Sequence, residues 1–156
     1  MRLSTKGRYA VMAMVDIAAN SSGNPTSLAD VAYRQEISQS YLEQLFAKLR
    51  RAGLVKSVRG PGGGYLLAHS AGETRIADII LSVDEDIKVT RCSPGSPGCT
   101  SKNSRCLTHD LWQELGNKIR LYLNSISLED VVDDRILGSS GESHRREQNN
   151  SFVAAE

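Results

Sequence analysis

The sequence predicts a mainly α-helical protein with one small β-hairpin, arranged as a winged helix-turn-helix followed by a cysteine-rich segment and a long helix. Apolar residues recur at helical spacing in three successive segments before residue 53. A glycine-rich turn then separates two short runs of strand-forming residues. All three cysteines stand between residues 92 and 106, where the apolar periodicity is lost.

Three helices are expected in the first 53 residues. The first spans 5–20, and its apolar stripe consists of Ala10, Val11, Met14, Val15 and Ala18. The second spans 27–36 and begins at Ser27, with Asp30 placed three residues later for a capping arrangement. A turn at Ile37 and Ser38 leads to the third, which ends at Gly53. Its buried face is expected to hold Leu42, Leu45, Phe46 and Leu49.

A hairpin is expected directly after these helices. Strand-forming runs at 54–58 and 65–68 flank the turn-forming sequence RGPGGG. The glycines do not form a nucleotide-binding loop, because Tyr65 stands where GxGxxG requires glycine and no GxxxxGK followed by Ser or Thr occurs. As a wing tip, Gly60 lets the backbone approach DNA closely, and Arg59 beside it is placed to enter a minor groove.

Charge is divided unevenly along the chain. Residues 1–69 carry nine Lys and Arg against four Asp and Glu, a net charge of +5, whereas residues 70–156 carry −4. A basic first half favours a polyanionic partner. The longest apolar runs are short and interrupted by charge, and the first residues lack the features of a signal peptide. We therefore expect a cytoplasmic protein that makes no membrane contact.

The second helix of a helix-turn-helix enters the major groove of DNA, and its first residues meet base edges. Residues expected to read bases are Gln39, Ser40, Glu43 and Gln44. Residues expected to contact phosphates are Lys6, Arg8, Tyr9, Lys48 and Arg51. Ser40 and Glu43 would also form a capping box if the helix began at Ser40, so base contact and capping are equally open.

The second half is predicted to contain three further helices. One spans 75–85 and buries Ile76, Ile79, Ile80 and Val83 against the hairpin. A long one spans 111–126, with Thr108 as its N-cap, and its apolar stripe consists of Leu111, Trp112, Leu115, Ile119, Tyr122, Leu123 and Ile126. This stripe exceeds what a small winged helix covers, so a second copy of the chain is the expected partner, with packing within the chain as the alternative. A capped helix is expected at 127–134.

These elements divide the chain into four parts. Residues 1–70 form the winged helix-turn-helix, and 71–107 form a connecting helix with the cysteine-rich loop. Residues 108–137 contain the dimerisation helix and the terminal helix, and 138–156 form a polar tail that is expected to be disordered.

The cysteine segment offers four ligands in the order Cys92, Cys99, Cys106 and His109. A cytosolic location and an odd number of thiols disfavour disulfides, and a Cys106/His109 nucleophile lacks an evident orienting carboxylate or oxyanion site. Zinc accepts three thiolates and one imidazole but usually takes closer ligand spacings, whereas the long spacers suit a wider iron-sulfur cluster. Spacing alone leaves cluster and zinc equally favoured.

Three stretches together resemble the IscR family of iron-sulfur cluster assembly regulators: RLSTKGRYAVMAM, the run from SQSYLEQLF through GPGGGYLL, and RCSPG with RCLTHDLW. The resemblance covers residues 1 to about 135. It implies a DNA-binding transcription regulator, a repressor or activator and not an enzyme, that forms a homodimer on double-stranded promoter operators.

The same resemblance implies a 2Fe-2S cluster bound by Cys92, Cys99, Cys106 and His109 and supplied by the cluster assembly machinery. It further implies that Ser40, Glu43 and Gln44 read bases and that Arg59 enters the minor groove. In this family the cluster-bound dimer recognises one class of operator, and both forms recognise another. The chain departs from the best-known members, which have five residues between successive cysteines, because both of its gaps contain six. Added residues in a flexible loop cost little closure entropy, so ligation is expected to survive. A zinc-stabilised regulator or adapter is the alternative.

Overall fold

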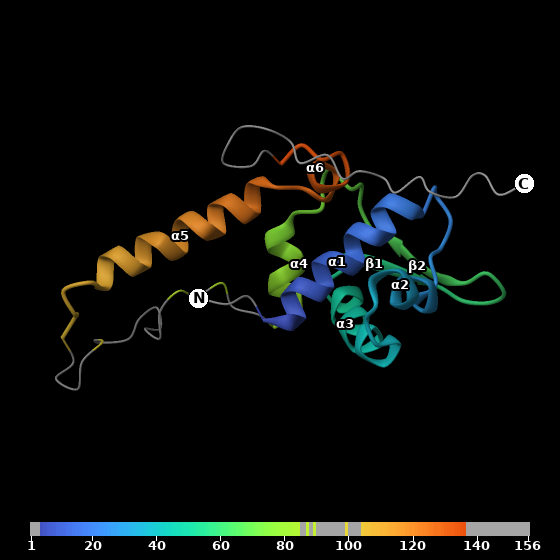
Figure 1. Cartoon of the computed structure of the whole chain (residues 1–156), viewed down its shortest axis with the longest axis horizontal. Helices are drawn as coiled ribbons and strands as arrows, with labels where there is room; N and C mark the ends of the chain where they lie inside the picture. Colours follow the sequence, from blue (N-terminus) through green and yellow to red (C-terminus); the bar gives the residue numbers. More distant parts are fainter. Residues whose placement is uncertain (1–3, 85–86, 88, 90–98, 100–103, 137–156) are drawn as a thin grey trace, which may run out of the picture.

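The computed structural model describes residues 4–84, 87, 89, 99 and 104–136. Within these residues, helices and one two-stranded antiparallel hairpin follow one another, as predicted from the sequence (Figure 1). In chain order the elements are α1 (Thr5–Asn20), α2 (Leu28–Gln35), α3 (Gln39–Arg51), β1 (Val55–Val58), β2 (Gly64–Leu67), α4 (Ile76–Ser82), α5 (His109–Ser125) and α6 (Leu128–Val132). Cys92 and the predicted disordered tail at 138–156 lie outside the described residues.

Helices α2 and α3 form the predicted helix-turn-helix. The Ser27 side chain caps α2 by accepting a hydrogen bond from the Asp30 backbone N–H, as expected. Glu36 ends α2 in the left-handed conformation, with φ of 53°, and Ser38 is the N-cap residue of α3. The predicted face of α3, Leu42, Leu45, Phe46 and Leu49, is buried. At its other end, Gly53 with φ of 75° stops the helix.

Helix α1 lies at the centre of the core, but its buried face differs from the predicted stripe. The structure buries Ala13 and Ile17 beside Ala10 and Met14, whereas Val11, Val15 and Ala18 are only partly buried. The difference arises because α1 packs against α2, α3, α4, α6 and β2 together, so that no single stripe of residues meets all of its neighbours.

The hairpin pairs Val55 with Leu67 and Val58 with Gly64. Thr26 adds a short bridge to Tyr65, with backbone hydrogen bonds of 2.9 and 2.8 Å in the two directions. A Cβ atom on Gly64 would lie 2.3 Å from the Thr26 carbonyl oxygen, so this close backbone approach requires glycine. The bridge fixes the hairpin to the start of the helix-turn-helix.

Helix α4 buries the four residues that the sequence assigned to its inner face, Ile76, Ile79, Ile80 and Val83. Its principal neighbour is α1, however, and the predicted packing against the hairpin is wrong. Backbone hydrogen bonds from Ile76 to Ile126 and from Leu128 to Thr74, each 3.0 Å, join the start of α4 to the end of α5. These bonds bring α4 beside α1, where its apolar face meets the core rather than the strands.

Helix α6 confirms the expected capped terminal helix. Ser127 and Asp130 form a complete capping box, and Leu128 is fully buried in the same core as α1. The bonds to the Asp130 carboxylate from the Ser127 hydroxyl and backbone N–H lower the pKa of Asp130.

Helix α5 leaves this core and extends away from it, with its first turn farthest from the body (Figure 1). Thr108 occupies the N-cap position as predicted, although its side chain makes no capping hydrogen bond. No residue of α5 is buried within the described chain. No helix among the described residues has the length and apolar character needed to cross a bilayer.

Candidate nucleic-acid interface and cysteine site

The outer face of α3 presents the residues predicted to read bases. Gln39, Ser40, Glu43 and Gln44 are all exposed and project from the first two turns of the helix. The Gln39 amide donates to the Glu43 carboxylate at 3.2 Å, and the Ser40 hydroxyl lies 2.9 Å from that of Ser38. The arrangement therefore offers a hydroxyl, two amides and a carboxylate to an incoming groove.

The capping-box interpretation of Ser40 and Glu43 is wrong. The helix begins at Gln39 rather than Ser40, its N-cap is Ser38, and that residue makes no capping hydrogen bond through its side chain. Glu43 consequently lies beyond the first turn and does not return to the backbone. Its carboxylate instead accepts from the Gln39 side chain, and base contact by Glu43 stays a prediction.

Lys48, predicted to contact phosphate, is paired within the chain. Its ammonium donates to the Asp84 carboxylate just beyond α4 at 2.7 Å. This hydrogen bond and the Lys48 charge lower the pKa of Asp84, and the charges of Lys6 and Arg51 act in the same direction. Three predicted phosphate-contacting residues thus surround one acidic side chain, which partly neutralises them.

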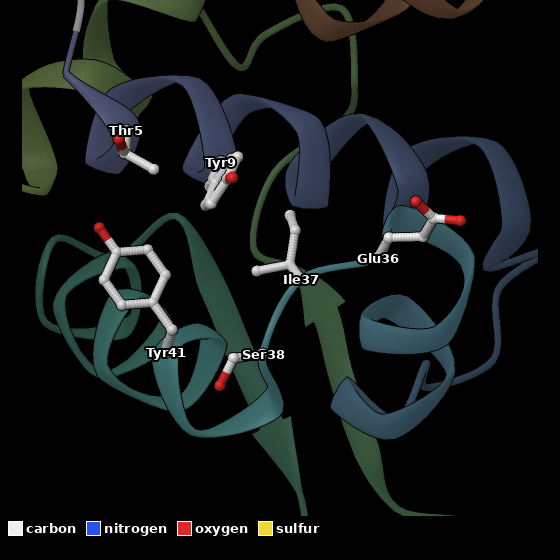
Figure 2. A pocket seen from close by; sticks show the side chains of 6 residues that line it. All are labelled: Thr5, Tyr9, Glu36, Ile37, Ser38 and Tyr41. Atoms are coloured by element: carbon white, nitrogen blue, oxygen red, sulfur yellow. The ribbon is translucent and has the colours of Figure 1, made fainter.

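A shallow pocket of about 530 Å³ lies between the start of α1 and the turn before α3 (Figure 2). Tyr9 from α1 and Tyr41 from α3 meet there edge to face, with ring centroids 6.0 Å apart. Thr5 and Ser38 also line the pocket. These hydroxyl-bearing residues can donate to phosphate oxygens. Of these residues, only Tyr9 was predicted to contact phosphate. The clustering of Thr5, Ser38 and Tyr41 around it depends on the packing of α1 on α3, which the sequence does not reveal.

The wing places Arg59 as predicted. Arg59 is exposed and directly follows β1. Gly60 and Gly62 have φ of 105° and 73°, a region that favours glycine. Arg8, at the exposed start of α1, is the remaining predicted phosphate contact.

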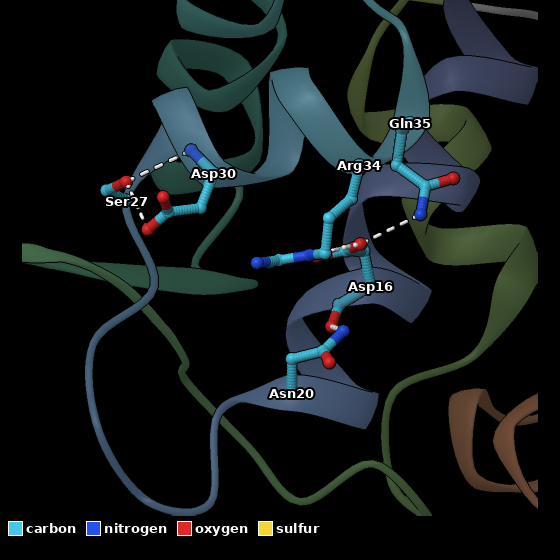
Figure 3. A network of polar contacts seen from close by, with 6 residues as sticks. All are labelled: Asp16, Asn20, Ser27, Asp30, Arg34 and Gln35. Carbon is cyan, nitrogen blue, oxygen red and sulfur yellow. Dashed lines mark hydrogen bonds and ion pairs between the residues drawn. The ribbon is translucent and has the colours of Figure 1, made fainter. Parts of the chain in front are cut away.

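A buried carboxylate positions the helix-turn-helix on α1 (Figure 3). Asp16 is 4% exposed and accepts hydrogen bonds from Arg34 Nη2 at 2.6 Å and Gln35 Nε2 at 2.8 Å. This pairing raises the pKa of Arg34. Both donors stand in the last turn of α2, immediately before the turn that begins α3. The sequence carried a signal for this contact, because Asp16 interrupts the apolar run of α1 between Val15 and Ile17.

The cysteine site brings together two of its predicted ligands. Cys99 Sγ lies 2.8 Å from His109 Nδ1. Cys106 stands in the turn before α5, where its carbonyl oxygen accepts from the His109 N–H at 3.0 Å. Cys99 and Cys106 are both free thiols, and Cys92 lies outside the described residues.

The donor types are those that hold an iron centre, although the described residues contain no group of three or more such ligands close enough to hold a metal ion. Thiolate sulfur and imidazole nitrogen are the atoms that ligate iron in clusters with mixed Cys and His ligation. Cys99 and His109 already approach each other although ten positions separate them, and Cys106 is tied to His109 through the backbone.

The Rrf2 family model, described as iron-dependent transcriptional regulator, matches residues 3–134. The chain is 51% identical over 148 residues to the HTH-type transcriptional regulator IscR of Klebsiella pneumoniae, covering 94% of this chain and 90% of that protein. It is 55% identical over 135 residues to the regulator of the same name from Photorhabdus laumondii, covering 86% and 81%.

Solved structures of transcriptional regulators are also similar to this chain. The structure of T. potens IscR is similar with a TM-score of 0.69 at 40% identity, covering 87% of this chain and 89% of that one. The structure of CymR, the global cysteine regulator of B. subtilis, is similar with a TM-score of 0.71 at 34% identity, covering 85% and 97%.

Replacing Asp84 with asparagine should strengthen binding to duplex DNA. The change removes the carboxylate that pairs with Lys48, so the ammonium becomes available to a phosphate. We expect about 2- to 5-fold tighter binding at low salt, the range of an exposed ion pair. The slope of log affinity against log salt should steepen by about 0.9, as measured by fluorescence anisotropy. Asp78→Asn is the matched control, because it makes the same charge change on α4. Equal effects of both substitutions would contradict a specific role for the Lys48 pair.

Proposed function

The chain belongs to the Rrf2 family of iron-dependent transcriptional regulators, and on that premise we propose that it is a homodimer whose choice of promoter DNA follows the occupancy of a 2Fe-2S cluster. It is a DNA-binding transcriptional regulator rather than an enzyme. The observation that carries the cluster proposal is the approach of Cys99 Sγ to His109 Nδ1 at the first turn of α5. Similarity to proteins named IscR supports it.

We assign the ligands to Cys92, Cys99, Cys106 and His109. When bound, the cluster supplies a redox-active and labile iron centre whose presence reports the supply of iron-sulfur clusters. The chain's own part is to hold three thiolates and one neutral imidazole near the start of α5. The cluster assembly machinery is the proposed donor. Since promoters and that machinery meet in the cytoplasm, we place the protein there.

The proposed DNA contacts divide into base reading and phosphate contact. Gln44 presents an amide that can pair with adenine, Glu43 accepts from cytosine N4, and Ser40 bonds several bases. Gln39 presents a further amide on the same face as these residues. The cations Lys6, Arg8, Lys48 and Arg51, with Tyr9, fix the position of the helix on the duplex. The wing reaches the adjacent minor groove through Arg59 and Gly60.

A second copy of the chain is the proposed partner for α5. The far part of its apolar stripe is open to solvent, with Leu111, Trp112 and Tyr122 exposed by 61, 42 and 55%. Intramolecular packing accounts for the other end of the stripe, where Leu123 and Ile126 pack against the core. A self-complementary helix pair would bury these residues and place two recognition helices on a palindromic operator.

The first prediction concerns the cluster. Protein purified without oxygen should be coloured and contain about two iron and two sulfide per chain, as the proposed 2Fe-2S cluster requires. The measurement is an anaerobic absorption spectrum with iron, sulfide and zinc analysis. His109→Ala should lose most of the colour, whereas His69→Ala, which alters a histidine outside the ligand set, should retain it. Colourless wild-type protein with stoichiometric zinc would show that the alternative, a zinc-stabilised regulator, is correct.

A second prediction concerns sequence discrimination. Glu43→Ala should narrow the affinity ratio between a preferred and a non-preferred operator by about 5- to 150-fold, corresponding to about 1–3 kcal/mol for one base contact. On a non-preferred operator the Glu43 carboxylate faces a base that has no donor, so it loses water and gains no hydrogen bond. Removing the carboxylate therefore lowers the free-energy cost of binding that operator. Arg59→Ala should instead weaken binding to both duplexes. Competition anisotropy measures both ratios, and unchanged binding by both variants would contradict the docking.

A third prediction concerns assembly. Trp112→Glu places a charge in the apolar stripe, so the variant should sediment as a monomer at concentrations where the wild type is a dimer. Leu121→Glu is the matched control, because Leu121 is 62% exposed but, at ~100° per residue, projects from the opposite side of α5. Analytical ultracentrifugation distinguishes the species. A dimeric Trp112→Glu variant would rule out the stripe as the interface.

A further inference from the structure

The imidazole ring of His109 is held at both nitrogens. Nδ1 faces Cys99 Sγ at 2.8 Å, and Nε2 lies 3.1 Å from the Gln113 side-chain oxygen. Gln113 is four residues further along α5, and residues four apart share one face of a helix. The ring therefore lies between the cysteine segment on one side and its own helix on the other.

This arrangement determines which nitrogen can bind a metal. A neutral imidazole carries its proton on one nitrogen and offers a lone pair at the other. An amide oxygen can only accept a hydrogen bond, so Gln113 places the proton on Nε2. The lone pair then belongs to Nδ1, the atom that faces Cys99. Groups that accept from the remote N–H of a histidine ligand orient the ring and raise its basicity.

The surroundings of Gln113 are consistent with this role. A Cβ atom at Gly116 would lie 3.5 Å from the Val89 side chain, so Val89 lies beside α5 about one turn beyond Gln113. Asp110, the acidic residue next to His109, pairs instead with Arg105 at 3.4 Å. The acceptor at Nε2 is thus a neutral amide, although a carboxylate stands nearby.

We propose that Gln113 is a positioning residue for the cluster: its side-chain oxygen fixes His109 as the Nε2–H tautomer and thereby selects Nδ1 as the ligating atom. This proposal rests on the proposed function, because it assumes that His109 is a cluster ligand. It assigns Gln113 no direct contact with the cluster.

Three variants test the proposal. Gln113→Leu removes the acceptor, so anaerobically loaded protein should lose its cluster to a chelator about 10- to 100-fold faster than the wild type. Gln113→Glu restores an acceptor and should retain the cluster, with a lower midpoint potential because a carboxylate makes the imidazole a stronger donor. Glu114→Leu, the matched control, introduces the same leucine in the same turn of α5 and should match the wild type.

A readout on the cluster-free protein tests the tautomer itself. Long-range proton–nitrogen NMR correlation at mildly alkaline pH should show the His109 proton on Nε2 in wild type and Gln113→Glu, and a mixture in Gln113→Leu. Equal cluster lifetimes for Gln113→Leu and Glu114→Leu, failure of Gln113→Glu to retain the cluster, or a proton on Nδ1 in the wild type would each overturn the assignment. If wild-type protein binds no cluster, the proposed function fails. If it binds one and the Gln113 variants do not differ, only this proposal fails.

Discussion

Two backbone hydrogen bonds, from Ile76 to Ile126 and from Leu128 to Thr74, determine the layout of the molecule. They close a long excursion of the chain, because α5, which follows α4 in sequence and extends away from the core, ends beside the start of α4. Leu128, fully buried just beyond this junction, anchors the returning chain in the core around α1. The end of α5 is thereby fixed while its first turn extends away from the body. The cysteine site therefore lies far from the recognition helix within one chain.

Helix α4 connects the two functional regions. Its start is joined to the end of α5, and Asp84 just beyond its last turn pairs with Lys48 on α3. The same chain continues from Asp84 toward Cys92. The cysteine segment is thus connected along the chain to Asp84, which pairs with Lys48. Helix α5 connects the same segment to the proposed partner subunit.

The local elements were predictable because their signals are local. The apolar residues of α3, the cap at Ser27 and the hairpin glycines specify structure within a few positions of one another. Contacts over longer separations were missed. Asp16 is satisfied by Arg34 and Gln35 across a helix pair, and α1 has several neighbours where one stripe had been assumed. The capping box at Ser40 and Glu43 did not form because the N-cap of α3 is Ser38, two residues before Ser40. The sequence contains the proposed ligands as one string, but the contact between the His109 ring and Gln113 depends on side-chain geometry.

The central claim is that cluster occupancy changes which DNA the protein binds. The most direct measurement compares one anaerobic preparation before and after cluster removal, using two operators of different class and the same salt concentration. We predict that cluster loss weakens binding to one operator at least about tenfold, or about 1.4 kcal/mol, and leaves the other within about twofold. Equal affinities of the two forms for both operators would contradict the account.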